Sequence, residues 1–410
     1  MKKLCILLSL VLVLLSCTAF AETTLEVYAD ANGFDSSMFI PFFDAFTAET
    51  GIKVDLVSPG ENYEALLKVR MANNSMPDIW STHGWAVARY GEYLYPQNEM
   101  SYAGDLSELI LPIITDNEGV IYTLPMNIDI AGMTVNADVL AQVDVKPEDI
   151  VTWADFTAVC AKLKEKGIAA IAIGGKDTWT AGAYFNYVAG CFFAADEEGV
   201  YTNQLQEGTF DWNLWAEPTQ LYADWFNNGY INVDCLTADY DTMVRLVAEG
   251  KAAFIFHGAS AAASVVSKNP DVNITMIPWP AKAEGEKQIV YGGEHIAFGA
   301  WKDGANLDAA KQLLEYMAKD EVMSKIASQT GMPAGRKSVS SETGYLSSFY
   351  ESIANNPNVR SIPFFDREYL PSGMWDDMCI TAEFVLSGDQ DAVQKTVDYM
   401  RESYEEKMDE

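Results

Sequence analysis

The chain has 410 residues, a length that predicts about two domains rather than one simple core. Apolar residues make up 49% and charged residues 21%, an ordinary globular balance that argues against a disordered chain. The formal net charge of −32 disfavours nucleic acids and acidic membrane surfaces as partners, because both are negatively charged.

The N-terminus has the pattern of an export signal. Two lysines precede an apolar run at residues 4–15, which is too short to span a bilayer. Small residues favour cleavage after Ala21, so that 1–21 would be a signal peptide. A lipobox-like sequence offers the alternative that Cys17 becomes lipidated. Either way, the mature chain is expected in the periplasm or on the outer face of the cell membrane.

Strand and helix patterns alternate after the signal. Such alternation predicts right-handed βαβ units and a largely parallel sheet flanked by helices. In the first part of the chain we expect strands at 25–29, 52–57 and 78–80, and helices at 39–50 and 63–71.

The same alternation resumes after residue 150, with Thr152 as the expected N-cap of a helix that ends before Gly167. Residues 197–208 have the polar composition of a surface loop, and 292–295 are also expected to form a loop. Strands are predicted at 168–173, 252–256, 274–277 and 296–298. Helices are predicted at 215–226, 243–248, 307–317 and 389–406, together with one that ends at Gly331 and one that begins near Trp375.

The sequence around the cysteines favours buried free thiols over disulfide bonds. Cys160 continues the apolar face of a predicted helix, although export would permit disulfides among Cys160, Cys191, Cys235 and Cys379. The sequence contains no metal-type CxxC, no HExxH and no phosphate-binding loop, so no metal or other cofactor is expected.

The segment 122–140, YTLPMNIDIAGMTVNADVL, places Asn127 and Asp129 among apolar neighbours. Polar groups in a buried segment are costly unless something satisfies them. This segment is therefore predicted to cross between two lobes and to present Asp129 to a ligand in the cleft between them.

A series of short motifs carries a family resemblance over nearly the whole mature chain. In order they are TGIKV at 50–54, MPDIW at 76–80, YTLPMNIDIAGMTVN at 122–136, TWADF at 152–156, EGKAAF at 249–254, GGEHIAF at 292–298, AAKQLLEYM at 309–317 and TGMPAGR at 330–336. Their order resembles that of the extracellular solute-binding proteins of bacterial ABC importers, in the sugar-binding branch that includes maltose-binding protein.

The resemblance implies an α/β, two-lobed periplasmic-binding-protein fold of type II, with mainly parallel sheets and short hinge crossings. Lobe 1 would comprise 22–128 plus 292–331, and lobe 2 would comprise 129–291 plus 332–410. It also implies a monomer without enzymatic activity that closes on a sugar and delivers it to permease subunits in the membrane.

Sugar binding requires aromatic faces for the rings, and carboxylates or amides for the hydroxyl groups. By resemblance, Asp129 matches a ligand-contacting acid, Asp177 with Trp179 an acid–aromatic pair, and Trp375 a stacking aromatic. Where maltose-type proteins carry a tryptophan this chain has Gly258, which leaves the length of the sugar open. The candidate ligand-binding residues are Asn32, Asp35, His83, Trp85, Asp129, Asp177, Trp179, His257, Trp279, Glu294, His295, Arg336 and Trp375.

Several alternatives stay open at this point. Trp279 would pack the hinge, and Arg336 would cap a helix, if neither reaches the cleft. Acidic and aromatic residues together would also suit a polyamine or another cationic solute. A secreted glycosidase also needs paired carboxylates beside aromatic residues.

Overall fold

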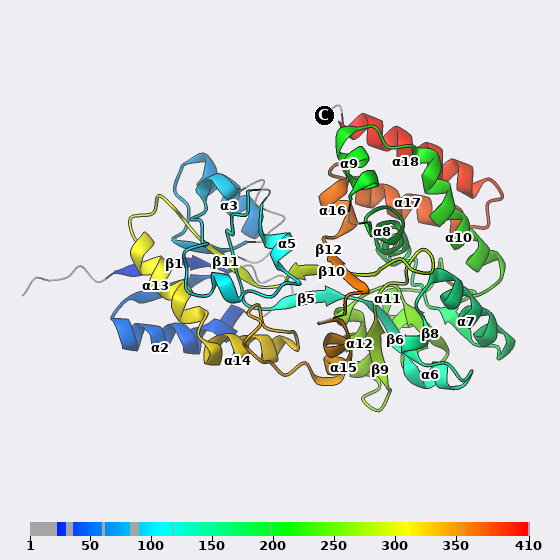
Figure 1. Ribbon diagram of the computed structural model, residues 1–410, viewed down its shortest axis with the longest axis horizontal. Coiled ribbons are helices and arrows are strands. Elements are labelled where there is room, and N and C mark those ends of the chain that lie inside the picture. Colours follow the sequence, from blue (N-terminus) through cyan, green and yellow to red (C-terminus); the bar gives the residue numbers. More distant parts are fainter. Residues whose placement is uncertain are drawn as a thin grey trace, which may run out of the picture.

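The computed structural model describes residues 23–29, 36–59, 62–82, 90–116, 118–196, 198–354 and 356–408. The chain forms two lobes, with the N-terminal elements in one and the C-terminal helices in the other (Figure 1). Five of the residues singled out above lie outside the described residues, namely Cys17, Asn32, Asp35, His83 and Trp85.

The first lobe is built on a five-stranded sheet whose strand order is β2-β1-β3-β11-β4. Strand β1 is parallel to β2 and β3, whereas β11 is antiparallel to β3 and β4. The strands are β1 (Thr24–Tyr28), β2 (Lys53–Val57), β3 (Ile79–Ser81), β4 (Leu124–Pro125) and β11 (Ala297–Ala300). The helices are α2 (Ile40–Thr50), α3 (Tyr63–Ala72), α5 (Leu111–Ile114), α13 (Leu307–Met317) and α14 (Asp320–Thr330).

An aromatic stripe joins α2 to this sheet, as its helical spacing predicts. Phe43 and Phe46 are buried, and Phe39, just before the helix, meets Phe298 of β11 edge to face at 5.2 Å. Gly51 ends α2 in a left-handed conformation with φ of 77°, which glycine adopts without steric cost.

The second lobe has a four-stranded sheet of order β7-β8-β6-β9. Its strands are β6 (Met133–Asn136), β7 (Ala169–Ile171), β8 (Ala252–Ile255) and β9 (Ile274–Ile277). The helices are α6 (Ala137–Ala141), α7 (Trp153–Glu165), α8 (Trp179–Phe193), α9 (Val200–Glu207), α10 (Ala216–Asn227), α11 (Tyr240–Ala248), α12 (Ala259–Lys268), α15 (Ser347–Ile353), α16 (Phe365–Tyr369), α17 (Met374–Leu386) and α18 (Ala392–Met408).

The expectation of mainly parallel sheets needs correction, because both sheets are mixed. Strands β7 and β8 are parallel, but β6 is antiparallel to β8 and to β9. Strand β6 follows directly from a crossing segment. It therefore enters its sheet from the side of the first lobe and runs away from that lobe. Strand β8 runs the opposite way and ends beside that crossing.

Three strands lie between the lobes and pair with one another in the order β12-β10-β5 (Figure 1). They are β5 (Ile128–Ala131), β10 (Gln288–Glu294) and β12 (Val359–Ile362). Strand β4 belongs to the first sheet and β6 to the second, so the segment 122–140 passes from one lobe to the other, as predicted. Residues 292–294 were expected in a loop but form the end of β10, because they pair with β5.

The structure differs from the predicted lobe boundary near residue 332. The backbone N–H of Ile128 donates to Pro333, and that of Lys337 donates to Asp105. Residues 333–337 therefore lie against first-lobe segments, although 332–410 was assigned to the second lobe.

Helix α8 is not among the elements predicted from the sequence. Every residue from Thr180 to Phe193 is buried, so the helix lacks the polar face that produces an amphipathic period. Residues 197–208 were expected to form a loop, yet α9 occupies most of them, between Gly199 and Gly208 in left-handed conformations.

The four cysteines expected to be buried thiols, Cys160, Cys191, Cys235 and Cys379, are buried and free. Within the described part of the chain, no helix has both the length and the apolar character needed to cross a membrane.

Close packing of α8 against α17 depends on Gly182. A Cβ atom at this position would lie 2.5 Å from Sγ of Cys379 and 2.9 Å from its Cα. Because the second contact is with backbone, Gly182→Ala is expected to lower the free energy of unfolding by about 2 kcal/mol or more. Urea denaturation would measure this effect. Gly104→Ala is the matched control, since a Cβ there meets no atom within 4 Å.

Candidate functional site

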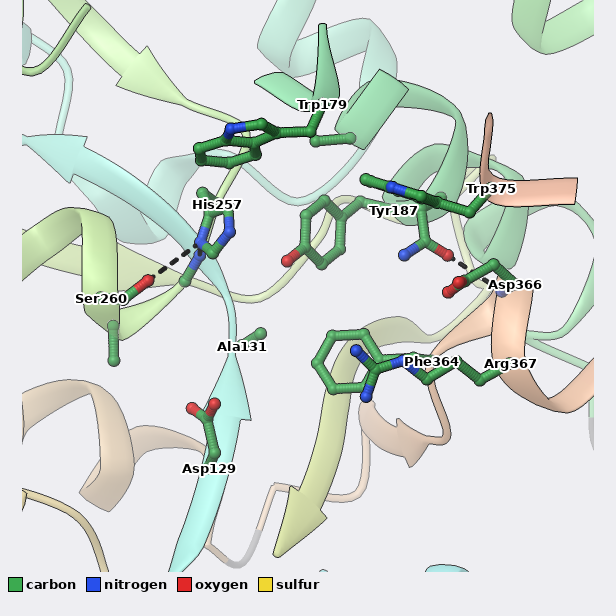
Figure 2. Close-up of a pocket in the computed structure, with 14 residues that line it drawn as sticks. Asp129, Ala131, Trp179, Tyr187, His257, Ser260, Phe364, Asp366, Arg367 and Trp375 are labelled. Atoms are coloured by element: carbon green, nitrogen blue, oxygen red, sulfur yellow. Dashed lines mark hydrogen bonds between the residues drawn. The ribbon is translucent and has the colours of Figure 1, made fainter. Parts of the chain in front are cut away.

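A pocket of about 340 Å³ lies where the crossing strand β5 meets the second lobe (Figure 2). Its wall comes from β5, α8, the loop from β8 into α12, the segment around α16 and the first turn of α17. The lining residues are Asp129, Ala131, Trp179, Ala183, Asn186, Tyr187, His257, Gly258, Ala259, Ser260, Phe364, Asp366, Arg367 and Trp375.

Asp129 is the polar group of this pocket contributed by the crossing strand. Its Oδ1 atom is buried and has no hydrogen-bond partner among the described residues. Burial raises the pKa of the carboxyl from 3.8 to about 6. A carboxylate oxygen at the pocket wall that has no partner among the described residues can accept a hydrogen bond from a ligand.

Aromatic side chains form much of the remaining wall. Trp179 begins α8 and Trp375 lies in the first turn of α17, and both are partly exposed. Tyr187 reaches the pocket from two turns further along α8, and its ring centroid is 6.4 Å from that of Phe364. Figure 2 shows Trp179 and Trp375 on one side of the pocket, with Asp129 on the opposite side.

Trp279 lies behind this wall rather than on it. Its ring is fully buried and stacks on Tyr187 at 4.3 Å with an interplanar angle of 6°. The indole Nε1–H donates to the carbonyl of Ala131 at 2.9 Å. The structure therefore favours the alternative that Trp279 packs the hinge, where it fixes both Tyr187 and β5.

His257 lines the pocket as a neutral imidazole. Burial lowers its pKa to about 4. Nδ1 accepts a hydrogen bond from the backbone N–H of Gly258 at 3.0 Å, and the ring meets Trp179 edge to face at 5.3 Å. A Cβ at Gly258 would lie 2.9 Å from that of Ala131. A larger residue here would push this loop away from β5, so the departure from the maltose-type sequence has a packing role.

Two charged pocket residues, Asp366 and Arg367, were missed in the sequence. The backbone N–H of Asp366 donates to Oδ1 of Asn186 at 3.0 Å, and burial raises the pKa of the Asp366 carboxyl. The Arg367 guanidinium lies 5.3 Å from the centroid of the Phe364 ring. The sequence FFDREY at 364–369, in which three charged residues stand between aromatic residues, is the signal that could have identified this segment.

Other candidates lie away from the pocket wall. The carboxylate of Asp177 accepts the backbone N–H of Tyr240, the first residue of α11, at 2.7 Å. Arg336 pairs with Asp105 and with Asp320 at the start of α14. It also donates to the carbonyl of Ala318, the C-cap of α13, so Arg336 caps a helix instead of reaching the pocket, although the helix is α13 and not the one directly before it.

Glu294 and His295 do not line the pocket either. Glu294 ends β10 opposite Ile128 and is buried. Because neighbouring residues of a strand face opposite sides, Glu294 points away from the side on which Gly293 lies. The described residues contain no group of three or more His, Cys, Asp or Glu side chains placed to hold a metal ion.

Comparison with protein families identifies the chain. The model of the family described as bacterial extracellular solute-binding protein matches residues 42–358. The chain belongs to this family. It is also 32% identical to the melibiose/raffinose/stachyose-binding protein MelE of Bacillus subtilis over 361 residues, which cover 87% of this chain and 83% of MelE.

Solved structures of family members share the fold. One, described as the binding protein MsmE of B. subtilis in an open conformation, has a TM-score of 0.86 at 29% identity and covers 95% of this chain and 98% of its own. Another is a sugar transporter protein of Bacillus licheniformis in complex with stachyose. It has a TM-score of 0.72 at 30% identity, and the match covers 94% of this chain and 100% of that structure. At nearly equal identity, this solute-binding protein superposes more closely on the open structure.

Proposed function

We propose that this solute-binding protein captures a carbohydrate in the pocket where the crossing strand β5 meets the second lobe. The observation that carries the proposal is the buried Oδ1 of Asp129, which has no partner among the described residues, in a pocket walled by Trp179, Tyr187 and Trp375. Carboxylates accept hydrogen bonds from sugar hydroxyls, while aromatic faces cover the apolar C–H faces of the rings. The wall also carries Arg367, which would repel a cationic ligand, and Asp366, which with Asp129 would attract one, so titration with polyamines is needed to test that alternative.

The relatives suggest which sugars to test first. MelE is a melibiose/raffinose/stachyose-binding protein, and the B. licheniformis structure contains stachyose. We therefore propose small oligosaccharides of this kind as ligands.

Ligand binding would draw the first lobe onto the pocket through bending of β5, β10 and β12. The greater similarity to an open structure than to a stachyose complex supports this motion. The closed protein would then deliver its ligand, chemically unchanged, to the permease subunits of an ABC importer. We further propose that the protein is a monomer, exported by 1–21 and lipid-anchored if Cys17 is modified.

Calorimetric titration and thermal shift test this function directly. Melibiose, raffinose or stachyose should raise Tm, because a ligand that binds only the folded state stabilises it. Spermidine and putrescine are the comparison ligands, and binding of these polyamines without any sugar would contradict the proposal. Mass spectrometry of the sugar after incubation should recover it intact, whereas hydrolysis would favour the glycosidase alternative.

A further inference from the structure

The crossing strand β10 presents two residues to the pocket side of the hinge. It pairs antiparallel with β5, with Tyr291 opposite Ala131 and Gly293 opposite Asp129. Side chains of directly opposed residues lie on the same face of a sheet. Positions 291 and 293 therefore lie on the same face of the hinge sheet as Asp129 and Ala131, which line the pocket, although neither position is itself part of the pocket wall.

These two positions differ in how much space they fill. Tyr291 is fully buried, stacks on Phe364 at 5.7 Å, and donates its hydroxyl to backbone carbonyls of α8. Gly293 is partly exposed and has no side chain. A Cβ built there would have one neighbour within 4 Å among the described residues, a ring carbon of Phe364 at 3.9 Å.

The preceding glycine serves a different purpose. A Cβ at Gly292 would clash with Oγ of Ser361 and would lie 2.9 Å from Cδ1 of Ile113. Gly292 is therefore required for packing on the far face of the hinge. Gly293, in contrast, has room for a side chain on the pocket face, and its absence leaves bare backbone between Asp129 and Phe364.

We infer that Gly293 is a specificity-determining residue, whose bare backbone lets the terminal ring of the ligand reach Asp129 at the hinge. This inference rests on the proposed function. Asp129 would accept hydrogen bonds from hydroxyls at the ring edge, and Phe364 would contact the ring from the adjacent wall. A terminal ring carrying an acidic group would be repelled by Asp129, so this position selects neutral sugars with free hydroxyls.

The inference is tested by refilling the space at residue 293. Gly293→Ala and Gly293→Val are both compatible with an extended strand, and valine favours strands, so Tm without ligand should not fall. We expect the Kd for raffinose, measured by calorimetry, to rise about 10-fold for alanine and more than 100-fold for valine. The factor should be similar for melibiose and stachyose, since each would place one terminal ring at this position.

Gly292→Ala is the matched control on the opposite face, and it should lower Tm. Unchanged raffinose affinity in Gly293→Val would overturn the inference while leaving the proposed function intact. If valine disturbs folding, the alanine variant decides, and a Kd within twofold of the wild-type value would equally overturn it. Failure of the wild-type protein to bind any sugar would instead contradict the proposed function and, with it, this inference.

Discussion

Asp129→Asn is expected to weaken sugar binding by about 100-fold at pH 7.5. An ionised carboxylate accepts charge-assisted hydrogen bonds from hydroxyls, each worth about 1.5–3 kcal/mol in a desolvated site. Asparagine retains one acceptor and turns an amide N–H₂ toward the ligand. Titration calorimetry with raffinose would measure the loss. Asp177→Asn is the control, because Asp177 holds the start of α11 and does not line the pocket. A Kd unchanged by Asp129→Asn would contradict the site.

The same substitution should stabilise the ligand-free protein at neutral pH. Burial raises the Asp129 pKa from 3.8 to about 6, so the folded state binds more protons than the unfolded state between these values. Stability therefore falls as pH rises through this window, by about 3 kcal/mol in total. Asparagine removes that cost, and Tm should rise by a few degrees at pH 7.5. The gain should vanish near pH 4, as thermal unfolding across pH would show.

Sugar affinity of the wild-type protein should decrease as pH falls below about 6. Ligand hydroxyls need the ionised carboxylate of Asp129 as their acceptor, and protonation competes with them. His257 does not contribute in this range, because burial lowers its pKa to about 4. Calorimetry at pH 5.0 and 7.5 would detect the change, and Asp129→Asn should show a smaller pH dependence, limited to the contribution of Asp366, whose pKa is also raised by burial.

Trp179→Ala and Trp375→Ala should each weaken raffinose binding by roughly 30- to 100-fold. Both rings are partly exposed in the pocket, and covering one face of each with a sugar ring removes about 80 Å² of apolar surface from water, worth about 2 kcal/mol. Dispersion contacts with the ring add to this value. The double variant should show no measurable binding by calorimetry.

Trp301→Ala provides the matched control for these two variants. Trp301 is also partly exposed, but it packs beside the first-lobe sheet and does not line the pocket. Its loss should lower Tm and leave the Kd within threefold. Equal weakening by all three substitutions would indicate a general loss of structure and would argue against the assigned roles of Trp179 and Trp375.

Much of the fold was predictable, because amphipathic helices and short strands each have a characteristic spacing of apolar residues in the sequence. Thr152 is the N-cap of α7 as predicted, and it forms a capping box with Asp155. Gly331 ends α14, also as predicted. Helix α8 was not predictable in this way, since burial on all sides removes its polar face. The antiparallel direction of β6 and β11 could not be predicted either. It depends on the end of the sheet at which the chain enters after crossing between the lobes, and the apolar pattern of a strand does not record this.

The site was only partly predictable for the same reason. Trp179 and His257 follow predicted strands, Trp375 starts a predicted helix and Asp129 lies in the predicted crossing segment. All four line the pocket. Tyr187 was missed because it belongs to the unpredicted α8. Asp177 and Trp279 have the residue types of a binding site, but other parts of the protein already contact them. Asp177 accepts a backbone N–H, and Trp279 stacks on a buried ring. Sequence shows which chemistry is present, whereas the packing decides which groups are left for a ligand.

The position of β11 in the first sheet also sets the order of events during synthesis. This strand separates β3 from β4, yet its residues leave the ribosome about 170 residues after β4. At 5–20 residues per second, the first lobe waits roughly 10–30 seconds for its missing strand. Throughout that interval the sheet lacks the strand that pairs with both β3 and β4, so the lobe cannot complete its fold and the growing chain stays accessible to chaperones or a secretion machinery.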